Sequence, residues 1–285
     1  MTRHIAAAVA FIAFVLAAPW PGALPARAQM LVPAQTQGDD QVQFQPSTCA
    51  AIAMGLPGVT YAAATGTGLS AYQVRLTYAG HSTYVLESPD GVTIATDYAG
   101  WAGDVTPRVV TMNRAHTTHF TNSPDPAIEH VLRGWGADGN PAHHYVTIDD
   151  VLIRNVTTDI VRGEFRLPDA NSIFIFEVAG LCIGHLGHLH HELTDEHYAK
   201  IGRLDVVMVP IDGAMTLSLG GMAEIVERLR SSVILPMHAQ GWARPADLVS
   251  MLSENFDHKY LDSRSIVLSL NDLPKRPTIM VPRGL

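Results

Sequence analysis

Two short motifs that identify common catalytic chemistries are missing from this sequence of 285 residues. Without a Gly-x-Ser-x-Gly segment, nothing indicates a serine nucleophile elbow. Without a Gly-x-x-x-x-Gly-Lys-Ser/Thr segment, nothing indicates a phosphate-binding loop. Only two cysteines are present, Cys49 and Cys182, and neither lies in a setting typical of a reactive thiolate. The sequence therefore gives little support for a serine or cysteine nucleophile.

The scarcity of cysteine leaves two structural possibilities. In an oxidising compartment, Cys49 and Cys182 could form a disulfide. However, Cys182 lies in an apolar run that predicts a buried strand, and buried free thiols are common. We favour free thiols here and keep the disulfide as the alternative.

Long apolar runs are also absent, apart from one at the N-terminus. A short basic start precedes the unbroken apolar run Ile5–Ala18, and Ala26-Arg27-Ala28 has the small-x-small pattern of a cleavage site. This pattern predicts a signal peptide over residues 1–28, cleavage after Ala28, and a periplasmic or secreted protein. The alternative is an uncleaved anchor, but the run is shorter than the roughly 20 residues that span a bilayer. No integral membrane segment is expected once the leader is removed.

Basic residues are fewer than acidic ones, 19 Lys and Arg against 27 Asp and Glu. Loss of Arg3 and Arg27 with the leader leaves 17 basic side chains, a net charge of −10 with histidine neutral. So acidic a chain argues against a nucleic-acid partner. Residues 29–47 are rich in Gln, Asp and Pro and predict a flexible lead-in. Residues 48–285 predict a single domain.

The remaining pattern mixes strands and helices. Strands are predicted at 74–80, 82–88, 92–97, 107–112, 151–158, 172–180, 181–185, 204–211, 232–238, 265–270 and 277–282. Helices are predicted at 48–56, 125–132, 194–202, 218–230 and 245–255. Meandering strands followed by strand–helix units indicate a layered α/β protein.

Histidines gather where several of these strands end. "LCIGHLGHLHHEL" (residues 181–193) holds four histidines, His116 and His119 follow the strand ending at Met112, and His238 ends another strand. The carboxyl ends of strands in layered α/β folds tend to meet at one rim. Histidine is the commonest metal ligand, and a catalytic zinc takes about three protein ligands. Water on such a metal has a pKa near 7 and becomes a hydroxide nucleophile.

Each histidine also has a structural interpretation. His190 and His191 are adjacent on an extended segment, so at most one of them faces the site, and a structural role is favoured for both. The pair His143-His144 predicts a surface loop. A cluster that carries no ion is the remaining alternative, and it predicts no change in melting temperature on chelation.

Four blocks of this sequence resemble the metallo-β-lactamase fold superfamily, in particular its lactonase-like branch, which includes ascorbate-6-phosphate lactonase. The blocks are "VRLTYAGHSTYVLESPDGVTIATDYAG", "VVTMNRAHTTHFT", "LCIGHLGHLHHELT" and "LDVVMVPIDGAMTLSLGGMAEIVERLRSSVILPMH". Their order runs from Val74 to His238. The fold implied by the resemblance is α/β, a four-layer αββα sandwich with a metal site at the edge of its two sheets.

The resemblance also assigns site residues and shows where this chain departs from the family. His116, His119, His185 and His238 stand at family histidine positions. Residues 114–119 stand at the metal-binding loop of the family, which we call the metal loop. Arg114 replaces the first histidine of this loop, and Thr118 and His188 replace the two metal-binding aspartates. The predicted ligands are drawn from His116, His119, His185, His188 and His238. Asp97 and Asp212 are expected either to support these ligands or to supply the missing carboxylate, with His81 near the rim but off the metal.

The loss of both carboxylates predicts one metal ion. Two divalent ions held by neutral imidazoles would keep about four positive charges together, and Arg114 would add another. Like charges about 4 Å apart repel by about 4 kcal/mol per unit pair at an effective dielectric of about 20. Zinc suits imidazole ligands best, with iron, manganese, nickel or copper as alternatives.

The resemblance implies a metal-dependent hydrolase that attacks an ester, lactone or phosphoester of a small molecule, with an anionic substrate as one of the alternatives. Arg114 could bind a substrate carboxylate or phosphate, or point away to a surface acid. Thr118 can form hydrogen bonds but cannot take a proton at neutral pH. Hydrolysis would then depend on the metal alone or on a nearby histidine as base. The alternative is a descendant that binds a metal or ligand and catalyses nothing.

Overall fold

The computed structural model describes residues 47–50, 67–239 and 244–285, all in the compact unit Phe44–Leu285. The predicted signal peptide (1–28) and residues 29–46 of the predicted lead-in lie outside the described residues. So does most of the helix predicted at 48–56. No described helix has both the length and the apolar character that a bilayer span requires.

The first sheet has six strands. In spatial order they are β13 (Ser265–Leu268), β1 (Val74–Gly80), β2 (Thr83–Glu87), β3 (Thr93–Ala95), β4 (Val109–Met112) and β5 (His130–Arg133). Pairing is antiparallel from β13 to β3 and parallel from β3 to β5. The strands predicted at 82–88 and 92–97 form the antiparallel β2–β3 pair.

The second sheet has eight strands. In spatial order they are β12 (Asp257–Tyr260), β14 (Thr278–Val281), β11 (Val233–Met237), β10 (Val206–Pro210), β9 (Leu181–His185), β8 (Phe165–Val178), β7 (Val151–Arg162) and β6 (Tyr145–Ile148). The strands from β12 to β9 are parallel, and those from β9 to β6 are antiparallel. The strands β9, β10 and β11 are buried along their whole length, as continuous apolar runs predict.

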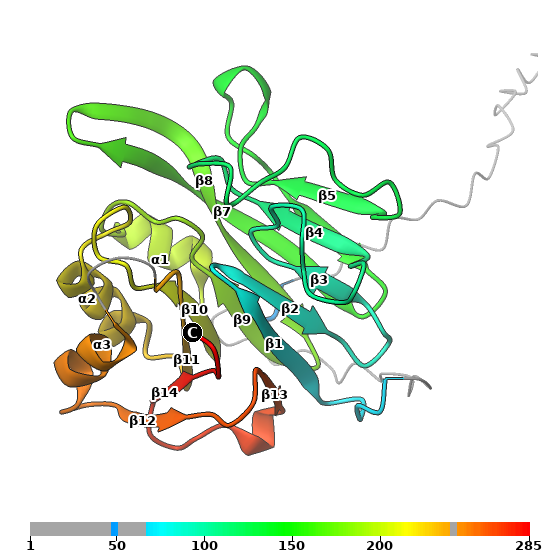
Figure 1. Cartoon of the computed structure of the whole chain (residues 1–285), viewed down its shortest axis with the longest axis vertical. Coiled ribbons are helices and arrows are strands. Elements are labelled where there is room, and N and C mark those ends of the chain that lie inside the picture. Colours follow the sequence, from blue (N-terminus) through cyan, green and yellow to red (C-terminus); the bar gives the residue numbers. More distant parts are fainter. Residues whose placement is uncertain (1–46, 51–66, 240–243) are drawn as a thin grey trace, which may run out of the picture. The chain divides into compact units, whose positions relative to one another are not determined.

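The two sheets stack face to face with one hydrophobic core between them. Side chains such as Leu86 and Ile94 of the first sheet pack with Phe174, Ile183 and Met208 of the second. The next residues along the second sheet point the other way and pack against helices. Figure 1 shows α1, α2 and α3 together beside β9, β10 and β11. The predicted α/β sandwich of two stacked sheets is confirmed, and among the described residues α-helices cover only the outer face of the second sheet, whereas the predicted αββα order has helices on both.

The three helices follow the predicted positions, and each begins at a local signal. α1 (Asp195–Ile201) has a capping box between Thr194 and His197. α2 (Leu219–Leu229) begins where the Ser218 side chain accepts a hydrogen bond from the Gly221 amide. α3 (Pro245–Leu252) has proline at its first position. The other outer face, on the first sheet, packs beneath loop residues such as Tyr98, Ala102 and Ile128.

Two predictions of local structure were wrong. Residues 125–132 do not form a helix, because His130 to Arg133 pair with Val109 to Met112 as β5. The β7–β8 hairpin is longer than predicted, because its outer residues continue to pair up to Arg162 and Phe165. In both cases strand pairing overrides the local pattern.

The expectation of free thiols was also wrong, because Cys49 and Cys182 form a disulfide. The bond joins the short N-terminal segment to the first half of β9. The same segment is held by Glu177, whose Oε2 accepts a 2.8 Å hydrogen bond from the Thr48 amide. Both cysteines lie in the same apolar cluster, so the apolar surroundings of Cys182 do not argue against pairing.

Candidate metal centre

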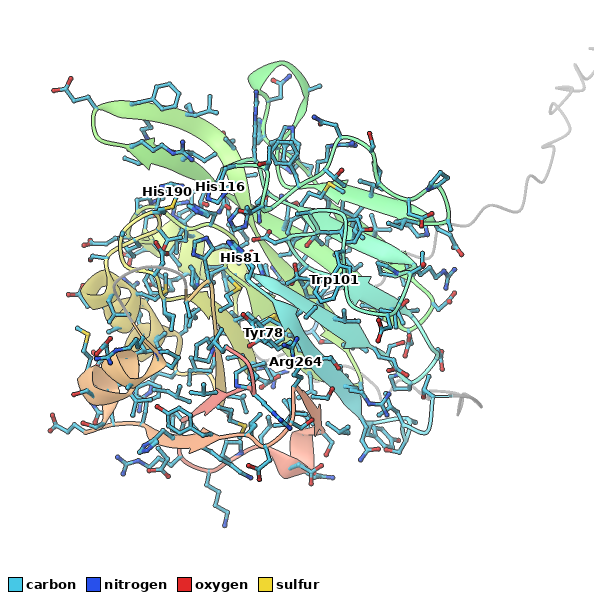
Figure 2. All side chains as sticks on the ribbon, viewed as in Figure 1. Tyr78, His81, Trp101, His116, His190 and Arg264 are labelled. Carbon is cyan, nitrogen blue, oxygen red and sulfur yellow. A yellow bond between two sulfur atoms is a disulfide. The ribbon has the colours of Figure 1, made fainter. Side chains whose placement is uncertain are left out.

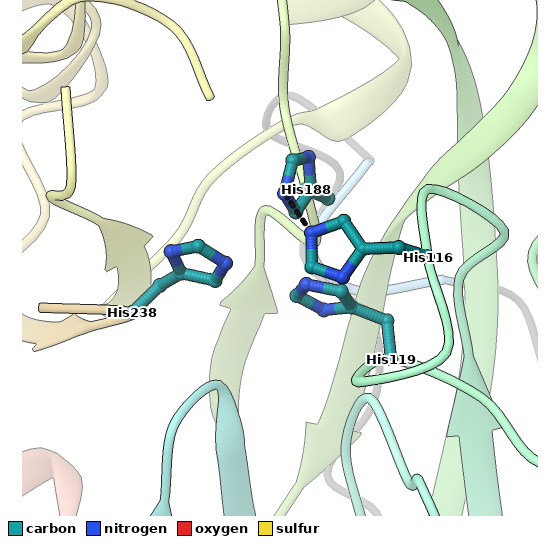
Figure 3. Close-up of side chains that lie close together, drawn as sticks. All are labelled: His116, His119, His188 and His238. Carbon is teal, nitrogen blue, oxygen red and sulfur yellow. Dashed lines mark hydrogen bonds between the residues drawn. The ribbon is translucent and has the colours of Figure 1, made fainter. Parts of the chain in front are cut away.

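Four histidines meet at one edge of the two sheets (Figure 3). His116 and His119 lie in the loop after β4, His188 lies in the loop after β9, and His238 directly follows β11. One ring nitrogen from each lies within 4.8 Å of the others. Three of the rings are buried, and His116 is half-buried. The ends of three strands therefore deliver four imidazoles to one point.

The metal loop is folded by its own backbone. The His119 amide donates to the His116 carbonyl at 3.0 Å, and the Asn113 amide donates to the His119 carbonyl at 3.1 Å. These bonds turn both imidazoles toward the same side. On the opposite strand end, His238 has a φ of 53°, and its amide donates to the His81 carbonyl at 2.8 Å. That bond ties the end of β11 to the β1–β2 turn.

The third loop depends on a glycine. Gly187 has a φ of +61°, and a Cβ there would meet the Asn113 Nδ2 atom and come within 2.8 Å of Asn171 Oδ1. Asn171 Oδ1 in turn accepts a 2.9 Å hydrogen bond from the His188 amide. The missing side chain at residue 187 therefore lets His188 approach the metal loop.

Two of the imidazoles have a carboxylate beside the Nδ1 atom. Asp97 Oδ2 lies 2.8 Å from His119 Nδ1, and Asp212 Oδ1 lies 3.2 Å from His238 Nδ1. A ring that shares its Nδ1 proton with a carboxylate presents the Nε2 lone pair to a metal. Asp97 and Asp212, the two acids that the sequence singled out, are thus both placed to set the tautomer of a ligand.

The other two imidazoles have uncharged partners at Nδ1. Thr118 Oγ1 lies 2.6 Å from His116 Nδ1, and His190 Nε2 lies 2.9 Å from His188 Nδ1. All four rings therefore have a polar neighbour at the same nitrogen. This arrangement leaves Nε2 as the coordinating atom of each ring.

The inward-facing nitrogens lack protein partners. Among the described residues, the buried Nε2 atoms of His119 and His238 have no hydrogen-bond partner, and His238 Nδ1 lies near Asp212 without forming a hydrogen bond. The Nε2 atoms of His116 and His188 lie only 3.0 Å apart. Two lone pairs at that distance repel unless a proton or a cation lies between them. Buried, unpaired nitrogens directed at one point are what a metal ion would satisfy.

Burial keeps these ligands uncharged. Desolvation, reinforced by the neighbouring imidazoles, lowers the pKa of His116 to about 4 and the pKa of His188 still further. Both rings are neutral at pH 7 and available to a metal without losing a proton. A protonated cluster is disfavoured by the same repulsion.

The two carboxylates stay ionised. Burial alone would raise the pKa of Asp97, but His185, His119 and Asn113 outweigh it and bring the pKa well below its usual value. Burial also opposes ionisation of Asp212, whose pKa is nonetheless lowered by the adjacent His238 ring and by hydrogen bonds from Thr216 and from the Met215 amide. Two negative charges therefore stand directly behind the imidazoles.

His185 is one predicted ligand that the structure does not bring into the cluster. It is the last residue of β9, and its Nε2 lies 2.8 Å from the Ser82 carbonyl oxygen. Its Nδ1 accepts a 3.1 Å hydrogen bond from the Gly187 amide. Both ring nitrogens of His185 thus have backbone partners, one in the β1–β2 turn and one in the loop after β9. The ring does not face the point at which the four clustered histidines meet.

The remaining predicted residues lie around the cluster. Arg114 is exposed on the metal loop. The His81 ring lies 4.3 Å from that of His238, and its Nδ1 is 2.9 Å from Ser82 Oγ. Figure 2 places His81, His116 and His190 at the same end of the strands.

Sequence reasoning missed several residues that shape the site. Ser82 Oγ lies 3.0 Å from His119 Nδ1, and Arg162 Nη2 donates to the Ala115 carbonyl at 2.7 Å. His190 faces the cluster, whereas His191 Nε2 accepts from the Asp159 amide. The alternation of an extended segment did indicate that only one of these two histidines would face inward. Nothing in the sequence singled out Arg162.

Fold and site together define a metal-binding α/β-sandwich protein. The chain belongs to the β-lactamase superfamily: a family model described as "Beta-lactamase superfamily domain" matches residues 75–238, more than half of the chain. A metal-dependent hydrolase of Pyrococcus abyssi is 30% identical over 81 residues, which cover 28% of this chain and 36% of that relative. The chain thus matches little more than a third of the length of this relative.

Solved structures extend the likeness. One from Thermotoga maritima, described as a Zn-dependent hydrolase of the metallo-β-lactamase superfamily, has a TM-score of 0.53 and 25% identity. The match covers 73% of this chain and 98% of that one. A Parabacteroides distasonis structure described as a metal-dependent hydrolase has a TM-score of 0.51, 14% identity and coverage of 64% and 89%, and shows the fold alone. The relative and the two solved structures that this chain resembles are thus all described as metal-dependent hydrolases.

Proposed function

We propose that this protein is a secreted hydrolase that uses one divalent metal ion to cleave an ester, lactone or phosphoester bond in a small molecule. The observation that carries the proposal is the convergence of four imidazoles, each with a polar partner at Nδ1. Zinc is the favoured ion because imidazole nitrogen suits it. The lactonase-like branch of the superfamily stays a prediction.

The charges favour one ion over two. His116, His119, His188 and His238 would hold it, and all four are neutral ligands when they coordinate through Nε2. Asp97 and Asp212 contribute two negative charges behind the rings. One divalent cation balances those charges, whereas a second would leave an excess of about two.

The protein groups around the ion have separable tasks. A bound divalent ion supplies Lewis acidity and lowers the pKa of water toward 7. Asp97 and Asp212 orient His119 and His238 through their Nδ1 atoms. Thr118 holds His116 and cannot itself take a proton. A site without a carboxylate base suits a bond that breaks readily, such as an ester or lactone.

Export is supported by two independent features. The leader pattern of residues 1–28 predicts cleavage after Ala28 and a periplasmic or secreted location. The disulfide between Cys49 and Cys182 fits an oxidising compartment.

Metal counting and a substrate panel test the proposal. The purified mature protein should contain about one metal ion per chain by mass spectrometry, and a His119→Ala/His238→Ala variant should contain none. The exposed His258 on β12 gives a matched control, because His258→Ala should keep the ion. The metal-loaded protein should hydrolyse at least one of 4-nitrophenyl acetate, γ-butyrolactone and bis(4-nitrophenyl) phosphate. Failure to take up zinc, iron or manganese would contradict the proposal.

A non-catalytic metal-binding descendant is the second candidate. The observation that favours it is the replacement of family metal positions by Arg114, Thr118 and His188. It predicts full metal occupancy with no metal-dependent turnover of any substrate in the panel. The two candidates therefore differ in the assay and agree in the metal count.

A further inference from the structure

The outer half of the β7–β8 hairpin projects past the sheet as a two-stranded ribbon (Figure 1). The neighbouring strand β6 pairs only with residues 151–154 of β7, and β9 pairs only with residues 174–178 of β8. Beyond those pairs, β7 and β8 pair with each other alone. A lone two-stranded ribbon is marginally stable, so its other contacts decide where it lies.

Those contacts are with the loops that carry the metal ligands. Arg162 Nη2 donates to the carbonyl of Ala115, the residue next to His116. The Asp159 amide donates to His191 Nε2 at 3.1 Å. The ribbon is thus fastened to both histidine loops, and it brings the Arg162 guanidinium to the exposed side of the metal loop.

The guanidinium of Arg162 has N–H donors that no described residue uses. Its side chain is exposed, and no carboxylate in the described part of the chain forms an ion pair with it. Other arginines of the same hairpin are paired, Arg166 with Asp159 and Arg154 with Glu177. A guanidinium has five N–H donors, and the contact with Ala115 uses one.

The charge of Arg162 reaches the metal site. Its guanidinium contacts the carbonyl of the residue directly before the ligand His116. His116 and the neighbouring His190 are both only half-buried. Both rings stand at the mouth of the cluster, so an anion bound there would meet the guanidinium and the metal together.

We propose that Arg162 is the residue that binds an anionic group, a carboxylate or a phosphate, on the substrate of this metal site. The inference rests on the proposed hydrolase function and names its substrate class. Arg162 is better suited than Arg114, because the bond to Ala115 fixes its direction before the substrate arrives. A fixed guanidinium fork matches the two oxygens of a carboxylate or phosphate.

The test compares charged and neutral substrates of the zinc-loaded protein. For Arg162→Gln, kcat/KM for mono(4-nitrophenyl) glutarate should fall roughly 10–100-fold relative to kcat/KM for neutral 4-nitrophenyl acetate, mostly through KM. The matched control is Arg166→Gln on the same hairpin, which should leave that ratio unchanged. Calorimetric titration with glutarate and with inorganic phosphate then measures anion binding to the wild type and to Arg162→Gln. The anion that Arg162 prefers is the one whose affinity falls by a similar factor in Arg162→Gln.

The outcomes separate this inference from the hydrolase proposal. An unchanged substrate ratio and unchanged anion affinities in Arg162→Gln would overturn the role of Arg162 and leave the hydrolase standing. Absence of turnover in the wild type would overturn the hydrolase, and the anion titrations would still decide about Arg162. If Arg162→Gln loses zinc, Arg162→Lys decides, because it can keep the Ala115 contact while losing the fork. Full anion affinity in Arg162→Lys would then contradict the inference.

Discussion

At the scale of single residues, the side chain at position 188 sets the charge of the metal centre. The resemblance places a metal-bridging aspartate at position 188 and a second metal-binding aspartate at position 118. This chain has the neutral side chains of His188 and Thr118 there instead. The rings of His116 and His188 lie with their Nε2 atoms 3.0 Å apart. The site is therefore compact and short of negative charge, which limits how many cations it can hold.

The first prediction changes that charge. We expect the double variant Thr118→Asp/His188→Asp to bind close to two zinc ions per chain, where the wild type binds about one. Two added carboxylates offset the repulsion of about 4 kcal/mol per unit charge pair at about 4 Å. Metal content by mass spectrometry after dialysis against zinc measures the outcome. Thr118→Asn/His188→Asn adds no charge and should not gain an ion; a second ion there would refute the charge argument.

The second prediction concerns protons released on metal binding. Desolvation lowers the pKa of His116 to about 4 and lowers that of His188 as well, so both bind zinc without releasing protons at pH 5.5. Four imidazoles with the usual pKa of about 6.5 would release between about three and four protons. Titration calorimetry in two buffers of different ionisation enthalpy should give clearly fewer than three. A count above three would show that burial does not depress these two pKa values.

The choice among the histidines illustrates what a sequence can show at this scale. Position after a strand end predicted the neighbourhood of His116, His119, His188 and His238. Position did not show that His188, rather than His185, joins the cluster, because that depends on where each side chain points. His185 is still within β9 and points between the sheets to Ser82, while His188 lies beyond the Gly187 turn. Only the packed structure supplies that distinction.

At the scale of elements, continuous apolar runs were readily predicted and segments of mixed polarity were not. The strands β9, β10 and β11 have continuous apolar sequences that fit a doubly covered sheet. The strand β5 and the outer β7–β8 ribbon mix polar and apolar residues, and a neighbouring strand supplies their hydrogen bonds. The contact that places Arg162 beside the metal loop joins it to Ala115, far away in the sequence, so it could not be predicted in advance.

The third prediction concerns the turn between β9 and His188. We expect Gly187→Ala to lower the free energy of unfolding by about 1–3 kcal/mol more than Gly163→Ala does, and to weaken zinc binding. Both glycines have φ near +60°, but a Cβ at Gly163 meets nothing within 4 Å, whereas one at Gly187 meets Asn113 and Asn171. The control thus carries the backbone strain alone. Equal urea unfolding curves would mean that the close packing of this turn is unimportant.

At the scale of the whole molecule, stability and chemistry lie at opposite ends of one strand. Cys182 is the second residue of β9, and His188 follows the other end of the strand. The N-terminal segment joins the first end through the disulfide and through Glu177. The fold class was predictable because alternating strand–helix units admit few layered arrangements. The disulfide was not, because nothing local indicates which segment packs against Cys182.

The fourth prediction follows from this separation. Reduction of the disulfide should lower the free energy of unfolding by about 2–5 kcal/mol, because the crosslink spans 133 residues and its loss frees the unfolded chain. Zinc affinity at 25 °C should change less than twofold, since the metal ligands lie past the far end of β9. Guanidinium unfolding and zinc competition on oxidised and reduced wild type measure both quantities with every side chain unchanged. Loss of zinc upon reduction, with the protein still folded, would show that the crosslinked end and the metal loops are coupled through β9 rather than independent.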